Sequence, residues 1–236
     1  MNEVTRSKLA ATGISTLTTC LYRRGLRNVW LNGVVPVNAE SRMVGEAYTL
    51  RFIPAREDVG GMASYAAGPS IHQRAFEECP PDHVLVIDTR DELEACTCGN
   101  LLVARLKARG VAGVVTDGGF RDSGEVAALD FPAYHRKPVP PPSFLYLHAV
   151  ELNGPIGCAG VAIFPGDIMV GDAEGVIVVP AALADAVAAE AFEMARYDGF
   201  AAEKIAEGRS VYGLYPATEP AQVEYRRWLG DRGESA

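Results

Sequence analysis

The adjacent pair Arg121-Asp122 is the combination of side chains in this sequence that is best suited to chemistry. It follows Gly118 and Gly119, directly after an apolar run over 111–117 that predicts a buried strand. An arginine offers a planar fork to a substrate carboxylate, and an aspartate is a hard oxygen ligand for Mg²⁺ or Mn²⁺. The alternative is a plain surface turn in which the aspartate caps a following helix.

A predicted helix over 99–109 lies just before this pair in the sequence. Its first turn leaves backbone N–H groups unpaired, which favours binding of a carboxylate or phosphate. The strand predicted over 83–88 and the strand over 111–117 complete a βαβ unit with a parallel strand pair. Because ligands bind outside the carboxyl ends of parallel strands, we expect the helix start and the Arg–Asp pair to face one opening. Together they describe a site for a small α-keto acid.

Other candidate sites in the sequence are weaker. Cys96-Thr97-Cys98 resembles a metal or redox pair, but no second cysteine pair occurs at zinc-finger spacing. The four histidines show no paired metal-ligand spacing. The Gly-Gly pairs match neither a phosphate loop nor the dinucleotide fingerprint, and no Gly-x-Ser-x-Gly elbow is present.

The composition bounds the class of protein. The 236 residues are 48% apolar with a net charge of −8, which argues against disorder and against direct nucleic-acid binding. The apolar runs are shorter than the roughly 20 residues of a membrane span, and no signal peptide is expected at the N-terminus. Five irregularly spaced cysteines favour reduced thiols, so we expect a cytoplasmic protein.

Periodicity predicts the elements that must position the chemical groups. We expect a single domain over 1–236, with N-terminal helices within 1–25 and a C-terminal helical arm over 180–236. The fold class is mixed α/β, with a parallel βαβ core and an antiparallel flank. The Pro-rich segment 137–142 is interpreted as a stiff surface loop. Further helices are predicted over 5–24 (broken near Gly13), 70–79, 180–207 (interrupted at Gly199) and 218–229, and strands over 48–54, 168–171 and 176–179.

Two blocks of the sequence resemble the class II pyruvate aldolase family, which contains 4-hydroxy-4-methyl-2-oxoglutarate aldolase and the regulator of RNase E activity. The first block is GNLL at 99–102 with GVVTDGGFRD at 113–122, and the second is FPGD at 164–167 with GDAEGVIVVP at 171–180. The resemblance covers roughly residues 15–215. It implies a swivelling-type β/β/α domain that assembles as trimers or hexamers, with active sites between subunits.

The family's aldolases carry a signature of Gly, three residues, Asp, twenty residues, then Arg-Asp. Arg121 and Asp122 match its second half, whereas Asn100 stands at the position of the signature Asp and Cys96 at that of the Gly. The resemblance implies that Asp122 binds Mg²⁺ or Mn²⁺ and that Arg121 hydrogen-bonds the keto acid. An asparagine can hold a water molecule but cannot accept its proton, which puts general-base chemistry at this position in doubt.

The resemblance also assigns the substrate carboxylate to the start of the predicted helix. Gly99 begins this segment, and the backbone N–H groups of Leu101 and Leu102 would hold the carboxylate. A further acid near Glu193, on the helix over 180–207, would reach the metal site of the next subunit. That helix carries apolar residues on two faces, which is typical of a helix that touches a partner as well as its own core.

These features favour a divalent-metal-dependent lyase that cleaves 4-hydroxy-2-oxo acids to pyruvate, decarboxylates oxaloacetate, or does both. Its partners would be a small keto acid and other copies of this chain, without nucleic acid or membrane. The alternative is a non-catalytic, protein-binding regulator of the ribonuclease E type. Retention of Arg121-Asp122 favours the enzyme, and the loss of the signature Asp at Asn100 favours the regulator.

Overall fold

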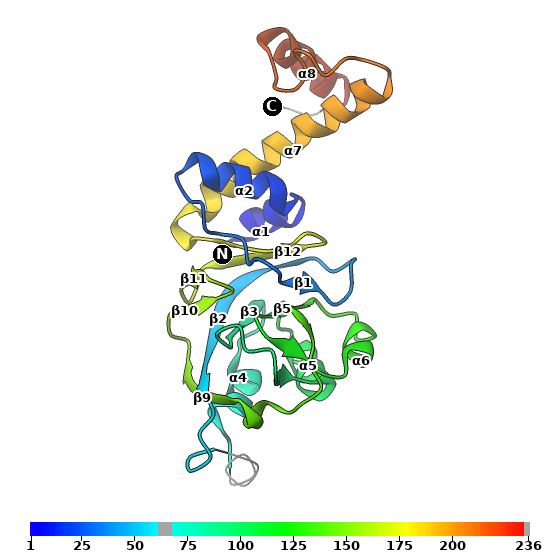
Figure 1. The fold of residues 1–236 in the computed structure, drawn as a ribbon. Helices are drawn as coiled ribbons and strands as arrows, with labels where there is room; N and C mark the ends of the chain where they lie inside the picture. Colours follow the sequence, from blue (N-terminus) through cyan, green and yellow to red (C-terminus); the bar gives the residue numbers. More distant parts are fainter. Residues whose placement is uncertain (61–67, 234–236) are drawn as a thin grey trace.

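The chain is organised around one mixed sheet, which the computed structural model describes within residues 1–60 and 68–233 (Figure 1). Eight strands of the described residues form this sheet, in the order β1-β7-β5-β3-β2-β12-β13, with β9 paired to β2. Their bounds are β1 (Val35–Pro36), β2 (Met43–Pro54), β3 (His83–Asp88), β5 (Gly113–Thr116), β7 (Ala133–His135), β9 (Leu147–Leu152), β12 (Ile168–Asp172) and β13 (Gly175–Val179).

The predicted βαβ unit forms the centre of the sheet. Strand β3 leads through helix α5 (Asn100–Ala108) to β5, and the two strands pair in parallel. The apolar run of β3 is buried on both faces, as is typical of a central parallel strand. Val84 and Val86 enter one hydrophobic cluster, whereas Leu85 and Ile87 enter another on the opposite face. The alternation of side chains along a strand therefore builds two cores from one segment.

The sheet nearly closes on itself through an extended segment before β2. Leu31 N donates to Val176 O of β13 at 2.9 Å, and Val178 N donates to Val29 O at 2.8 Å. A few residues later, Val35 of β1 pairs antiparallel with β7 at the other end of the strand order. The mixed α/β class with an antiparallel flank is thus confirmed, and the swivelling type stays a prediction.

Helices cover both faces of the sheet (Figure 1). Helices α1 (Glu3–Ala10), α2 (Ile14–Arg23) and the first part of α7 (Ala184–Ala206) pack together over β12 and β13. On the other side lie α4 (Ile71–Glu78), α5 and the short α6 (Ser123–Ala127). Apart from a C-terminal helix and three short strands described below, the remaining elements are a hairpin of β10 (Ile156–Cys158) and β11 (Val161–Ile163) and the single turns η1 (Ser143–Leu145) and η2 (Ala181–Leu183).

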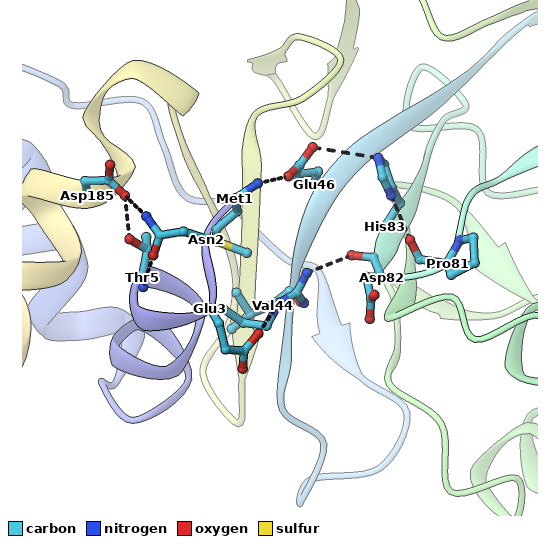
Figure 2. Close-up of polar contacts among 11 residues, drawn as sticks. Met1, Asn2, Glu3, Thr5, Val44, Glu46, Pro81, Asp82, His83 and Asp185 are labelled. Carbon is cyan, nitrogen blue, oxygen red and sulfur yellow. Dashed lines mark hydrogen bonds and ion pairs between the residues drawn. The ribbon is translucent and has the colours of Figure 1, made fainter.

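Polar contacts attach helix α1 to both the sheet and α7 (Figure 2). The ammonium group of Met1 forms an ion pair with Glu46 of β2, which lowers the pKa of that carboxyl. Asn2 Nδ2 donates to Asp185 Oδ1 at 3.1 Å, and Thr5 Oγ1 donates to the same carboxylate. The break near Gly13 is confirmed, since this glycine separates α1 from α2.

Gly199 does not interrupt the long helix, contrary to the sequence-based expectation. Helix α7 runs unbroken over Ala184–Ala206 after the turn η2. One glycine inside a helix costs only about 1 kcal/mol, and side chains beside it are anchored by packing. Phe200 is buried against Tyr225 and Trp228 of helix α8 (Glu219–Asp231). In Figure 1 this end of α7 and α8 stand away from the sheet.

The length and hydropathy of the described helices were compared with those of a membrane-spanning helix. None of them is long and apolar enough to cross a bilayer.

Candidate functional site

A second, small parallel sheet carries the residues that the sequence singled out. It consists of β4 (Cys96–Cys98), β6 (Gly119–Phe120) and β8 (Lys137–Pro138), in that order. Cys96 pairs with Gly119, and Gly119 pairs with Lys137. The Pro-rich segment 137–142 is therefore not simply a surface loop: its start is the third strand, and Val139 is buried with its N–H bonded to Phe120 O at 2.9 Å.

The two strand ends bring Arg121 and Asp122 against Gly99. Gly99 follows β4 and Arg121 follows β6, and Arg121 N donates to Cys98 O at 3.1 Å. A Cβ atom added to Gly99 would lie 2.4 Å from Asp122 Oδ2 and 2.9 Å from Arg121 Nε. The absence of a side chain at this glycine is thus what admits both groups to the start of α5. The predicted convergence of the Arg–Asp pair with the helix start is present.

The side chain of Asp122 does not cap the helix that follows it. The residue occupies the N-cap position of α6 with φ 56°, in the left-handed region, and its side chain makes no capping hydrogen bond. It lies instead 3.4 Å from Arg121 Nε and against Gly99. The capping role of Asp122 in the surface-turn alternative is therefore absent, while Arg121 and Asp122 are both exposed.

A cavity of about 410 Å³ opens beside this convergence. Arg121 lines it, with its side chain about half exposed. Gly99 caps α5 without a side chain, so the N–H groups of Asn100, Leu101 and Leu102 begin the helix free of a capping partner. The amide of Asn100 makes no hydrogen bond within the described residues, which leaves it available to a ligand or water. The lining residues are His72, Cys96, Thr97, Cys98, Gly99, Asn100, Leu101, Leu102, Arg121, Pro142, Ser143 and Phe144.

Two buried histidines, which sequence reasoning did not assign to the site, hold its strands in place. His72 Nε2 of α4 donates to the Thr97 carbonyl of β4 at 2.7 Å. His135 Nδ1 of β7 accepts from Phe120 N of β6 at 3.3 Å, and the two rings stack. Burial lowers the pKa of each histidine to about 4, so both are neutral near pH 7. No local sequence signal marks them, because their partners are distant in the chain.

The cysteines of β4 lie in the buried part of the small sheet. Cys96 and Cys98 are buried free thiols, and desolvation raises the pKa of both. In the described part of the chain, no cluster of three or more His, Cys, Asp or Glu side chains is placed to hold an ion. Cys96 instead contributes to the wall of the cavity.

A family model described as RraA-like, Aldolase/RraA, matches residues 14–178, which span the sheet and the site. The chain belongs to the RraA-like family. Its resemblance to the aldolases and RNase regulators is thereby confirmed at the level of the family.

The individual relatives carry names of two kinds, aldolase and RNase inhibitor. A Halalkalibacterium halodurans protein with the provisional name 4-hydroxy-4-methyl-2-oxoglutarate aldolase is 33% identical over 69% of this chain and 72% of its own length. The crystal structure of Streptomyces coelicolor RraAS2, titled an unusual member of the RNase ES inhibitor RraA family, is 29% identical with a TM-score of 0.73, covering 85% of this chain and 96% of that one. A Pseudomonas syringae structure at 21% identity has a TM-score of 0.79, over 91% and 98% of the two chains, and supports the fold alone.

The donor set of this RraA-like chain fits a cation that keeps much of its water. Asp122 supplies one carboxylate, which lies beside Gly99 at the start of α5. Mg²⁺ in proteins is often bound through one or two carboxylates, with water and substrate oxygens completing its shell. The residues therefore fit Mg²⁺ or Mn²⁺ through Asp122, with the Asn100 amide as a neighbour able to hold water.

Glu193 lies outside the cavity of its own chain. It is exposed on α7 and forms an ion pair with Arg196 at 3.1 Å. Glu190, on the same helix, pairs instead with Arg23 and Arg24 of the N-terminal region. An approach of Glu193 to the site of another copy stays a prediction.

Proposed function

We propose that the protein is a divalent-metal-dependent lyase that releases pyruvate from 4-hydroxy-2-oxo acids and decarboxylates oxaloacetate. The observation that carries the proposal is the packing of Arg121 and Asp122 against Gly99 at the start of α5, beside a cavity of about 410 Å³. Membership in a family whose description includes aldolases gives independent support. The Halalkalibacterium relative is named for aldol cleavage of a substrate of this class.

Each group at the convergence has a role in holding the keto acid. The first-turn N–H groups of Leu101 and Leu102 bind the C1 carboxylate, where the helix dipole favours a negative charge. The guanidinium of Arg121 donates to the C2 carbonyl oxygen, where negative charge gathers during the reaction. Asp122 holds the cation, which when bound supplies Lewis-acid polarisation of the same carbonyl.

The same electron movement serves both reactions. In aldol cleavage the C3–C4 bond breaks, its electron pair moves to C3 as the enolate of pyruvate, and the C4 hydroxyl loses its proton as it becomes a carbonyl. In decarboxylation of oxaloacetate the bond to the C4 carboxylate breaks and CO₂ leaves, with no hydroxyl to deprotonate. Asn100 cannot accept a proton. Decarboxylation should therefore be the faster of the two reactions in this chain.

The competing function is a protein-binding regulator without catalytic activity. Two observations favour it: Asn100 at the position where the resemblance places an acid, and the similarity to Streptomyces coelicolor RraAS2, whose title names an RNase ES inhibitor family. The intact Arg121-Asp122 pair favours the enzyme, since a non-catalytic regulator needs neither a carboxylate suited to a cation nor a guanidinium beside a cavity.

Oxaloacetate turnover decides between the two functions. With Mn²⁺ or Mg²⁺, we expect the purified protein to release pyruvate above the rate of the metal alone, and a chelator should abolish this difference. Asp122→Asn should remove the activity, because a neutral amide anchors a hard cation poorly. Its matched control is Asp130→Asn, an exposed aspartate past helix α6. Rates equal to the metal background would favour the regulator.

A further inference from the structure

A buried junction lies where the strands of the small sheet begin, at the ends opposite to Gly99 and Arg121. Asp117, at the end of β5 and two residues before β6, is completely buried. The turn 89–92 follows β3 and leads into β4, and Arg136 directly precedes β8. The contacts among these residues fix where each of the three strands starts.

Asp117 holds the turn 89–92 through both of its carboxylate oxygens. Oδ1 accepts hydrogen bonds from Thr89 N at 2.7 Å and from Thr89 Oγ1 at 2.8 Å. Oδ2 accepts from Asp91 N at 3.2 Å and from Ala159 N, between β10 and β11, at 3.1 Å. Burial raises the pKa of this carboxyl, and the hydrogen bonds from Thr89 and Ala159 oppose that shift. Four donors directed at two buried oxygens make Asp117 a rigid junction between β5, the turn and the hairpin.

The backbone of the turn depends on these bonds. Arg90 and Asp91 have φ of 61° and 59°, in the left-handed region that residues other than glycine rarely occupy. Their N–H groups are held by carboxylates at strand ends: Arg90 N donates to Asp88 Oδ1 at 2.8 Å, and Asp91 N donates to Asp117 Oδ2. Loss of the carboxylate at position 117 should therefore let the turn relax to another conformation.

The turn also contacts the residues that precede β6 and β8. A Cβ atom added to Gly118 would lie 2.9 Å from Thr89 Oγ1, so the turn packs directly against this glycine. Arg136 N donates to Gly118 O at 2.9 Å, and Arg136 Nη2 donates to Asp91 Oδ1 at 2.5 Å. A movement of the turn would therefore be passed on to all three strands of the small sheet.

We propose that Asp117 is a positioning residue of the site. Its carboxylate, acting through the turn 89–92, keeps β4 and β6 in their observed register. That register packs Arg121 and Asp122 against Gly99. The inference rests on the proposed lyase function for its kinetic consequence. A substrate carboxylate bound at the start of α5 moves with β4, whereas Arg121 moves with β6, so a shift between the strands draws the guanidinium away from the C2 carbonyl oxygen.

Hydrogen exchange of backbone amides tests the positioning without turnover. In Asp117→Asn the side-chain NH2 group accepts no hydrogen bond, so part of the junction is lost. We expect exchange in the segments 96–99 and 119–122 to rise about tenfold or more, because bonds to a charged group are removed. The control is Asp172→Asn, since this buried carboxylate of β12 accepts from two backbone N–H groups, one of them Ile14 N at the start of α2. Its exchange should rise at α2 instead, and unchanged exchange of β4 and β6 in Asp117→Asn overturns the inference.

The division between kcat and KM tests the consequence for the reaction. For oxaloacetate with Mn²⁺, we expect Asp117→Asn to lower kcat by about 100-fold, since a catalytic group misplaced by about 1 Å costs about that much. KM should change less than about threefold, because the N–H groups at the start of α5 still bind the carboxylate. Asp172→Asn, compared at a temperature where both variants are folded, should keep the kcat of the parent protein. A change confined to KM, or an equal loss of kcat in the control, overturns the inference.

Thr89→Val keeps the test decisive if Asp117→Asn does not fold. Valine preserves the shape of the side chain and removes one of the four hydrogen bonds to Asp117. We expect kcat to fall about threefold or more, in line with the loss of one hydrogen bond, and less than in a folded Asp117→Asn. Thr49→Val is the control, because that buried hydroxyl joins β2 to Gly154 O at 2.5 Å, beyond β9. A parent-like kcat in Thr89→Val overturns the inference.

Activity of the parent protein separates failure of the inference from failure of the lyase function. A parent protein without activity in Mn²⁺ or Mg²⁺ overturns the lyase function and the kinetic consequence with it. The exchange measurement does not depend on turnover and still decides whether Asp117 positions β4 and β6. An active parent protein whose Asp117→Asn variant matches it in exchange and in kcat overturns the inference alone.

Discussion

Gly99 is the residue on which the arrangement of the site depends most directly. Its φ is −123°, an extended backbone that any residue adopts, so the glycine is needed for space and not for conformation. A Cβ at this position would overlap the carboxylate of Asp122 and the side chain of Arg121. Both are ends of flexible side chains, which can move away without disturbing the fold.

We therefore expect Gly99→Ala to remove activity while sparing stability. The methyl group would displace the Arg121 and Asp122 side chains, with a loss of about 100-fold or more in kcat/KM, since displaced catalytic groups of this kind cost about that much. Its Tm should fall by only a few degrees, because Gly99 is the N-cap of α5 and replacing glycine by alanine at an N-cap costs about 1 kcal/mol. Gly124→Ala, where a Cβ meets nothing within 4 Å, is the control. Full activity in Gly99→Ala would contradict the assignment of the site.

Asn100 should set the balance between the two reactions. Asn100→Asp restores a proton acceptor beside the cavity, and general-base assistance typically contributes about 10²–10⁴-fold. We expect aldol cleavage to rise relative to oxaloacetate decarboxylation, measured on one preparation with both substrates. An unchanged ratio would mean that position 100 does not hold the water or proton of the reaction.

At the scale of elements, the site depends on how β4 and β6 are held. Each strand of the small sheet has two or three residues, too few to be stable alone. His72 fixes β4 through the Thr97 carbonyl, and His135 fixes β6 through the Phe120 N–H. His135 can accept this hydrogen bond only while Nδ1 is unprotonated, so the neutral form of the ring is the one that the structure uses.

The two histidines make the fold sensitive to moderate acid. Burial lowers the pKa of each to about 4, below the value of about 6.5 in an unfolded chain. Between these values the unfolded state binds more protons, so the free energy of unfolding should decrease as pH falls from about 6.5 to 4. The slope is at most about 1.4 kcal/mol per pH unit for each histidine.

Urea unfolding at several pH values measures this slope. His135→Asn keeps an acceptor for the Phe120 N–H but does not titrate. It should therefore reduce the slope of the unfolding free energy against pH by up to about 1.4 kcal/mol per pH unit. The surface histidine variant His83→Asn serves as the control, because that ring is partly exposed. Parallel curves for His135→Asn and the parent protein would show that His135 is not protonated on unfolding in this range.

At the scale of the whole molecule, the two apolar faces of α7 have an explanation within one chain. Val187, Ala188 and Ala191 are all buried, in the cluster that α1 and α2 share with the sheet. The two-faced pattern therefore gives no independent sign of a partner. The end of α7 differs, because with α8 it stands away from the sheet (Figure 1). The segment between these two helices exposes Tyr212 and Tyr215.

We predict a homotrimer, or a dimer of trimers, in which this arm contacts a neighbouring copy. Light scattering should give a mass of about three or six times the 25.2 kDa of one chain. Mixing an inactive Arg121 variant with an inactive Glu193 variant should restore part of the activity if two chains build one site. A fully active monomer would exclude the shared site, and inert mixtures of a stable trimer would exclude Glu193 from it.

Local sequence patterns were enough to predict much of the secondary structure and part of the candidate site. The apolar runs at 83–88 and 111–117, with a helix between them, predicted the parallel core, and Gly13 marked the break between the first two helices. The Arg121-Asp122 pair after Gly118-Gly119 placed candidate chemistry at a strand end. These features can be predicted from the sequence because strand alternation, helix ends and turn residues depend on neighbours in the chain.

Only the tertiary structure decided the features that depend on distant contacts. The first two residues of the Pro-rich segment form a strand because they pair with β6, and Gly199 is helical because the adjacent Phe200 packs against α8. The same holds for His72 and His135, whose role comes from carbonyl and N–H groups 25 and 15 residues away. Burial and long-range hydrogen bonds outweigh local propensities of about 1 kcal/mol. Because these contacts join residues that are far apart in the chain, a short stretch of sequence cannot predict the features that depend on them.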